Sequence, residues 1–468
     1  QDRQRPAACP AMNDSAQSLG FLGGLAIGSY DLISDASGSL AGATWILGNA
    51  PTTLNYQITT ASAGTILRIQ ASQITYAFFN GDQGASLLAN NAGDTNWATL
   101  ADGVTDTGVL PAITDALVFG TSNVTAGAKS LTLDGNLSVD SLIFNALTGV
   151  PSIAIAQGTS GILTLTPGSS ANGIAVNDSA GAITLSAPLA VGGIQTWRVD
   201  GTGANGSSLT LSGGVTYTAP VTKAGAGTLT LSGAGSGAGG LNIELGSVNI
   251  GSASAFGTGP LVLGSGVTLN NTSGAALANT GANTLEWNAG FTFTGTNSYD
   301  LGAGAVALKD FAALTVSANT LTVGGAIGDA AQGFTLTKLG AGNLVLNGVN
   351  SFGGAGRTVD VQGGLLTVNS DAALGHIGNA VTLAVNGGGA TTGLNVTGSF
   401  STSRVINLNA AANGLGVMLG QTLTLATPFT FSALTNNLTK NGSGNLILSS
   451  ANPGWTGGLT INSGVVRL

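Results

Sequence analysis

The chain has 468 residues and a formal net charge of −8, with 76 glycines, 43% hydrophobic, 7% charged and 5% aromatic residues. An apolar chain with so few charges is not an intrinsically disordered one, and the absence of a three-residue glycine period excludes collagen. Only 12 basic residues stand against 20 acidic ones, without a basic cluster beyond Arg3 and Arg5, so nucleic acid is not expected as a partner.

Glycine recurs every few residues, which disfavours long helices because glycine destabilises a helix interior. Short runs of Leu, Val, Ile and Thr alternate with Gly- and Asn-rich turns, a composition typical of strands and tight corners. The sequence therefore predicts an all-β protein.

Residues 1–74 differ in composition from the rest of the chain. They begin with a Pro-containing arm that holds the single cysteine, Cys9, and end with strand-like segments at 53–60 and 65–72. The apolar stretch 19–28 is too short to span a membrane, and no transmembrane segment is predicted. We expect this region to be a cap or a docking element, with Cys9 either a free thiol or paired to another molecule. Because the chain starts at Gln1, a signal peptide is expected to be removed already or to lie outside this sequence.

Residues 75–220 contain weaker strand–turn units, as at 131–145, 182–197 and 208–217. Each short strand alternates apolar and polar residues, so two or three apolar side chains point to one side. A single unit of this kind cannot bury its apolar side, but stacked units can. We interpret the region as degenerate coils of a parallel β-solenoid.

Residues 221–468 contain one motif three times, as VTKAGAGTLTLSG, LTKLGAGNLVLNG and LTKNGSGNLILSS, at intervals of roughly 100 residues. Each copy is followed by Gly-Gly and a further strand pair. The repeated positions, for which we predict structural roles, are Lys223, Gly225, Gly227, Leu229 and Leu231; Lys338, Gly340, Gly342, Leu344 and Leu346; and Lys440, Gly442, Gly444, Leu446 and Leu448. The lysines are expected to extend from a strand edge toward solvent or a carbonyl-rich corner.

An antiparallel sandwich is the alternative fold, since hairpin-type Asn-Gly pairs occur at 205–206 and 347–348. The motif recurs without dividing the chain into pieces of sandwich size, which favours the solenoid. About 20 coils spaced about 4.8 Å apart would give a rod about 100 Å long.

The motif Thr-Lys-x-Gly-x-Gly-x-Leu-x-Leu, then Gly-Gly and a second strand pair, closely resembles the autotransporter-associated β-strand repeat, also called the passenger-associated transport repeat. Asn96-Trp97, Pro111 and the strand Asp115–Phe119 are similar to the opening block of large repeat proteins of this kind, although a second Trp is missing. The resemblance implies an exported bacterial surface protein, such as an adhesin or a surface fibre. It also implies that the three lysines serve folding and export of the passenger.

The sequence offers little chemistry. The pairs Asp102/Asp106 and Asp31/Asp35 have no basic residue nearby, and His376 has no second histidine with which to bind a metal. The run 353–360 resembles a Ca²⁺-binding nonapeptide but occurs once and with the wrong spacing. We predict no catalytic residue, no metal, no cofactor and no enzymatic activity.

Three functions stay open at this stage. The first is an extracellular structural subunit that binds copies of itself end to end, with Cys9, Val465, Val466 and Leu468 as candidate contacts between subunits. The second is an adhesin that binds surface glycans, for which Trp97, Trp197, Trp287 and Trp455 are candidates. The third and least favoured is a polysaccharide-active β-helix enzyme. Whether the chain is a piece of a longer passenger is also left open.

Overall fold

The computed structural model describes residues 75–168, 172–201, 206–384 and 392–468, together with the backbone of five strands within residues 17–73. Of these five, β1 (Gln17–Leu19) and β3 (Trp45–Leu47) pair in parallel, and β2 (Gly28–Ser34), β5 (Ile66–Gln73) and β4 (Leu54–Ala61) form an antiparallel sheet. Cys9 and Asp35 lie outside the described residues, and Asp31 is described only as backbone of β2. A capping or docking role for residues 1–74 therefore stays a prediction.

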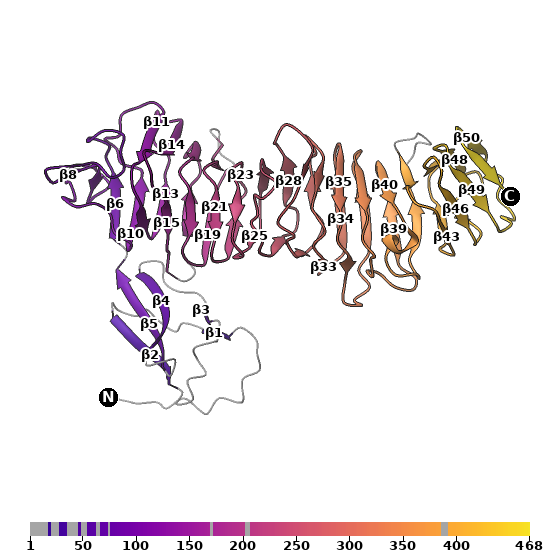
Figure 1. The fold of residues 1–468 in the computed structure, drawn as a ribbon, viewed down its shortest axis with the longest axis horizontal. Coiled ribbons are helices and arrows are strands. Elements are labelled where there is room, and N and C mark those ends of the chain that lie inside the picture. The colour runs from indigo at the N-terminus through magenta and orange to yellow at the C-terminus, as the bar shows by residue number, and fades with distance from the viewer. Residues whose placement is uncertain are drawn as a thin grey trace.

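From β6 onward the chain winds into one elongated parallel β-solenoid (Figure 1). Each coil places one strand on each of up to three faces, and strands on one face pair with those of the neighbouring coils. The parallel solenoid predicted from the sequence is confirmed, and the antiparallel sandwich is not found, because the strands of neighbouring solenoid coils in the described residues pair in parallel.

The first face is a 12-stranded sheet that ends at β36, followed after a gap by a four-stranded sheet. The 12-stranded sheet consists of β9 (Trp97–Ala98), β6 (Thr75–Phe79), β10 (Asp115–Phe119), β13 (Ser141–Phe144), β16 (Asn172–Val176), β19 (Gln195–Val199), β22 (Val221–Ala224), β25 (Leu241–Ile243), β27 (Leu261–Leu263), β30 (Leu285–Trp287), β33 (Val306–Leu308) and β36 (Ile327–Gly328). The four-stranded sheet, which takes the same place in chain order, consists of β43 (Phe400–Thr402), β46 (Thr422–Leu425), β49 (Asn445–Leu448) and β51 (Val465–Arg467).

The second face is an unbroken 14-stranded sheet. It consists of β11 (Lys129–Leu133), β14 (Ser152–Gln157), β17 (Ala182–Leu185), β20 (Ser208–Leu211), β23 (Thr228–Leu231), β26 (Ser247–Ile250), β28 (Thr268–Asn271), β31 (Thr292–Phe293), β34 (Ala312–Val316), β37 (Leu336–Leu339), β39 (Thr358–Val361), β41 (Ala380–Leu383), β44 (Ile406–Leu408) and β47 (Thr430–Phe431).

The third face is divided between a five-stranded and a nine-stranded sheet. The first contains β12 (Leu137–Val139), β15 (Leu163–Leu165), β18 (Leu189–Val191), β21 (Val215–Tyr217) and β24 (Gly235–Ser236). The second contains β29 (Leu277–Ala278), β32 (Tyr299–Asp300), β35 (Thr320–Val323), β38 (Asn343–Leu346), β40 (Leu365–Val368), β42 (Gly393–Val396), β45 (Ala412–Val417), β48 (Asn437–Asn441) and β50 (Leu459–Ile461).

The core is built by the strict alternation of these strands. In β23, Leu229 and Leu231 are buried while Thr230 between them lies on the outer side. The parallel register places Leu229 on Leu209 of the preceding coil and on Val248 of the following one, so identical positions stack along the solenoid axis. Stacking buries the apolar side chains that a single coil would expose to solvent, which is why the fold needs many coils.

Residues 80–114 close the N-terminal end of the solenoid. This segment contains the short hairpin of β7 (Asn90–Asn91) and β8 (Asp94–Thr95), and it also includes β9, which pairs antiparallel with β6. Trp97 is fully buried, its indole Nε1 donates to the Leu87 carbonyl at 2.9 Å, and its ring lies edge-on to Phe79 and Phe119. Of the residues that resemble a family opening block, Asn96, Trp97 and Pro111 lie in this cap, whereas Asp115–Phe119 forms the solenoid strand β10.

The estimate of about 20 coils is too high. The unbroken second face has 14 strands, which at about 4.8 Å per strand corresponds to a stack of roughly 60 Å. The difference arises because corners and insertions lengthen the coils, as in the connection around the 3-10 helix η3 (Asp371–Leu374).

Candidate functional site

The repeated motif forms a corner between two faces, with the lysine at the end of one strand and the Leu-x-Leu pair in the next. The lysine side chains are completely buried in all three copies. Lys338 Nζ donates to the carbonyl oxygens of Leu339 and Gly340 at 2.8 Å and to that of Gly363 in the following coil at 2.9 Å. All three ammonium protons are therefore used, and one side chain joins two coils.

The other two copies repeat this geometry. Lys223 Nζ donates to Ala224, Gly225 and, in the following coil, Leu245, at 2.8, 2.7 and 3.1 Å. Lys440 Nζ donates to Asn441, Gly442 and, in the following coil, Ser463, at 2.8, 2.6 and 3.3 Å. The ammonium groups thus lie in a carbonyl-rich corner inside the solenoid and do not reach solvent.

Each lysine occupies a position that apolar residues fill in neighbouring coils. Lys223 is stacked between Trp197 and Ile243, and Lys338 between Leu314 and Val361. The methylene stem continues the apolar column while the ammonium reaches the corner carbonyls. Burial lowers the pKa of Lys338 to about 8; it also lowers that of Lys223 to about 8, although Asp200 nearby raises it slightly. Burial lowers the pKa of Lys440 in the same direction.

The first glycine of each corner adopts a left-handed backbone that side chains disfavour. Gly340 has φ +78°, and a Cβ there would lie 2.3 Å from the Val316 carbonyl oxygen in the preceding coil. The second glycine, Gly342, donates its N–H to that same carbonyl at 2.8 Å. The equivalent left-handed glycines in the other copies are Gly225 and Gly442, and the second glycines are Gly227 and Gly444.

Two further sets of residues complete the corners and were not included in the predicted site. A valine of the preceding coil supplies the accepting carbonyl, and a left-handed glycine of the following coil packs against the corner carbonyls. The valines are Val199, Val316 and Val417, and the glycines are Gly246, Gly364 and Gly464. The sequence shows these glycines, because each is the Gly of the second strand pair that follows the motif. The valines precede the recurring motif, and their equivalence can be recognised only once the coils are stacked in the structure.

The three corners lie at different edges of the solenoid. Lys223 joins the first face to the second through β22 and β23, Lys338 joins the second to the third through β37 and β38, and Lys440 joins the third to the first through β48 and β49. Along the chain, each copy is therefore separated from the next by a whole number of coils plus one face. As a result, the three buried lysines lie at three different edges around the solenoid axis.

Most tryptophans proposed for ligand contact are not available for it. Trp97, Trp197 and Trp287 are completely buried in the core, so their assignment as adhesive side chains is wrong. Trp455 is half-buried and its Nε1 donates to the Asn436 carbonyl at 2.7 Å. Aromatic side chains at inward positions fill the interior of the coil, which explains the burial.

The acidic pair in the cap serves the local loop. Asp106 accepts from the Thr95 backbone N–H at 2.8 Å and from the Thr95 hydroxyl at 3.0 Å, and Asp102 accepts from the Val104 N–H at 3.0 Å. His376 is an exposed turn residue whose Nδ1 accepts from the Gly378 N–H. Within the described ranges no group of three His, Cys, Asp or Glu side chains could hold a metal ion.

At the C-terminal coil, Ile461, Val465 and Leu468 are 49%, 46% and 94% exposed. Val466 is partly buried against the core. In the part of the chain that is described, no helix combines the length and the apolarity needed to cross a membrane.

The family model of the passenger-associated transport repeat matches residues 221–250, 336–368 and 438–468, which are the three lysine corners with their following coils. The chain carries three passenger-associated transport repeats. A passenger repeat is thus a corner closed by a buried lysine, with the two strands that flank it and the next coil.

The adhesin BmaC autotransporter of Brucella suis biovar 1 (strain 1330) is 41% identical to this chain over 107 residues. The alignment covers 22% of this chain and 3% of the relative, so the chain spans a small fraction of that protein's length. No solved structure matches the chain.

Proposed function

We propose that this chain is an extracellular structural segment of an adhesin-type passenger, exported to a bacterial surface, where it serves as a stiff, non-enzymatic spacer. The observation that carries the proposal is the use of the passenger repeats: each lysine has all its protons bound inside the wall of one continuous core. Such residues hold coils together and leave no charged group for a reaction. The similarity to an autotransporter adhesin supports surface adhesion as the wider role.

The contacts of the charged side chains in the described residues agree with a non-enzymatic role. Asp102 and Asp106 accept hydrogen bonds from backbone N–H groups of their own loop. On the outer side of the first face, Lys309 pairs with Glu286 at 3.1 Å and Arg198 pairs with Asp200 at 2.8 Å. A glycosidase-type site would need two carboxylates facing each other across a groove.

End-to-end association is the second candidate. It is favoured by the last coil, where the strand β51 has an unpaired edge and the apolar side chains of Ile461, Val465 and Leu468 are exposed. Such an edge pairs readily with a further strand. A second copy that stacked its first coils there would extend the solenoid, because a contact between unlike ends does not close on itself.

The test is a comparison of two measurements on the purified chain and on cells. The chain, fused to an autotransporter export unit, is expected to be labelled by antibody on intact cells and to increase their attachment to host-cell monolayers. Loss of both, with the protein folded and produced, would overturn the proposed role. Negative-stain electron microscopy across a concentration series distinguishes the two candidates, since single rods at every concentration would refute end-to-end association.

A further inference from the structure

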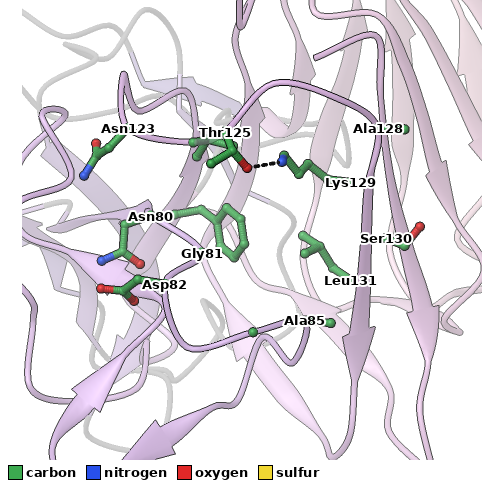
Figure 2. Close-up of a pocket in the computed structure, with 13 residues that line it drawn as sticks. Asn80, Gly81, Asp82, Ala85, Asn123, Thr125, Ala128, Lys129, Ser130 and Leu131 are labelled. Carbon is green, nitrogen blue, oxygen red and sulfur yellow. Dashed lines mark hydrogen bonds between the residues drawn. The ribbon is translucent and has the colours of Figure 1, made fainter. Parts of the chain in front are cut away.

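A cavity of about 350 Å³ lies at the junction of the cap with the first coils, away from the passenger repeats. It is bordered by the loop after β6, residues 80–85, and by residues 123–131, which lead into β11 (Figure 2). Its volume is within the range that small ligands occupy in proteins. The loop keeps its shape through backbone bonds to the buried Asn96, whose Oδ1 accepts from the Gln83 N–H at 2.7 Å and whose Nδ2 donates to the Ser86 carbonyl at 2.7 Å.

One polar atom in the wall of this cavity lacks a partner. Asn80 is 8% exposed, and its side-chain Oδ1 is buried without any hydrogen bond. Its backbone N–H already bonds to the Asn96 carbonyl at 3.1 Å, so the position of the residue is fixed. A buried acceptor without a donor is unfavourable, and a ligand that supplies a donor would relieve it once the Asn80 side chain turns its covered Oδ1 toward the cavity.

Charged groups of both signs border the same cavity. Lys129 Nζ donates to the Thr125 hydroxyl at 2.8 Å, which leaves two ammonium protons for a ligand. The carboxylate of Asp82 lies beside Asn80 in Figure 2, and it accepts no hydrogen bond among the described interactions. Phe79, Val124 and Leu131 provide the apolar part of the wall.

The combination of these groups selects the chemistry of a ligand. Asp82 and Lys129 carry opposite charges, so the cavity as a whole favours neither an anion nor a cation. A neutral polyol meets every requirement, because a hydroxyl group both donates and accepts. Neighbouring hydroxyls can donate to Asn80 and Asp82 while another accepts from Lys129, and the C–H side of a sugar ring can cover the apolar wall.

We propose that this cavity binds a neutral sugar residue of a surface glycan. The inference rests on the proposed function, since it supplies the adhesin with a carbohydrate subsite. It places that subsite in the cap, at the end of the solenoid opposite to the exposed last coil.

The test uses the whole chain and saturation-transfer NMR with the methyl glycosides of glucose, galactose and mannose. At least one is expected to bind saturably, while N-acetylneuraminic acid and glucosamine bind more weakly. Asn80→Leu and Asp82→Asn should each weaken the binding about tenfold or more, because the first removes an acceptor for a ligand hydroxyl and the second replaces a charged carboxylate, the stronger acceptor, by an amide. Asp102→Asn, a change in the same cap outside the cavity, should leave affinity unchanged.

Absence of saturable binding by all three glycosides, or equal binding by wild type and Asp82→Asn, would overturn the proposal. So would preferred binding of the charged sugars. A thermal melt of each variant identifies loss of the fold, and if Asn80→Leu unfolds, Asp82→Asn at its exposed position carries the test. Cell attachment that persists in Asp82→Asn would refute the cavity and leave the proposed function standing. Sugar binding by a chain that does not promote cell attachment would refute the proposed function and leave the sugar-binding cavity standing.

Discussion

At the scale of single residues, the passenger repeat depends on groups that satisfy one another across coils. A buried ammonium is unfavourable unless hydrogen bonds compensate it, and corner carbonyls are likewise left without partners where the ladder turns. The lysine satisfies both, since its three protons match three carbonyls of two coils. The glycine beside it permits the close approach to the preceding coil. We infer that these residues are structural.

Two glycines with the same backbone angle allow the close approach to be measured separately. Gly340 has φ +78° and no room for a Cβ, whereas Gly420 has φ +77° and nothing within 4 Å of the Cβ position. Gly420→Ala should lower the free energy of unfolding by about 1 kcal/mol, the cost of the left-handed backbone. Gly340→Ala should cost about 3 kcal/mol, since overlap with the Val316 carbonyl is added.

The measurement is urea unfolding followed by circular dichroism, with hydrogen exchange to locate the weakened coil. Equal losses of stability in both alanine variants would contradict the importance of the corner contact.

At the scale of elements, the first face has a gap that side chains close. Between β36 and β43 this face has no strand, so the regular ladder is missing there and only scattered backbone hydrogen bonds join the coils, such as Ser351 N–H to the Ile327 carbonyl at 2.8 Å and His376 N–H to the Phe352 carbonyl at 2.9 Å. Arg404, whose side chain is 1% exposed, donates from Nε to Asp371 Oδ1 at 2.8 Å and from its terminal nitrogens to carbonyls that include Gly375 at 2.8 Å. The buried Asn379 donates to the Phe352 and Leu374 carbonyls at 3.0 Å. These side chains replace the missing ladder.

Arg404→Lys should lower the free energy of unfolding by about 3 kcal/mol or more, because an ammonium cannot reproduce the planar fork and leaves buried acceptors unpaired. Arg198→Lys is the control: its ion pair with Asp200 at 2.8 Å is on the surface, and the change should cost less than about 0.5 kcal/mol. Thermal and urea unfolding would measure both. An Arg404→Lys variant as stable as the control would show that the gap needs no such support.

At the scale of the whole molecule, the buried lysines link stability to pH. The pKa of Lys223 and of Lys338 is about 8 in the folded chain against 10.5 when exposed, so between these values the unfolded chain binds more protons. The free energy of unfolding should therefore rise as the pH increases from about 8 toward 10, by at most about 1.4 kcal/mol per pH unit for each lysine. Above about pH 10 the buried Tyr217 and Tyr299, whose pKa burial raises, act in the opposite direction.

The double variant Lys223→Met and Lys338→Met should be less stable at neutral pH, because six carbonyl contacts lose their donor, and should lose most of the rise with pH, since only the buried Lys440 is left to contribute. Lys309→Met, at an exposed site, should keep the rise. Urea unfolding at a series of pH values is the measurement. A rise of undiminished size in the double variant would show that Lys223 and Lys338 do not cause it.

The sequence by itself determined the all-β class, the stacked coils and the three passenger repeats. These features follow from local properties: the alternation of Leu229, Thr230 and Leu231, and the glycines at corners, have the same consequences wherever the strand lies. The resemblance to the passenger-associated transport repeat rests on the same local sequence motifs.

Only the tertiary structure decided where the lysines point, which edge each repeat occupies and which aromatic side chains are buried. The third carbonyl bound by each lysine lies 22 to 25 residues further along the chain, and equivalence between Val199, Val316 and Val417 appears only when coils are stacked. The cavity beside Asn80 likewise joins the cap to the start of β11. Contacts between coils depend on the length of every intervening corner, and no local pattern in this chain fixes those lengths.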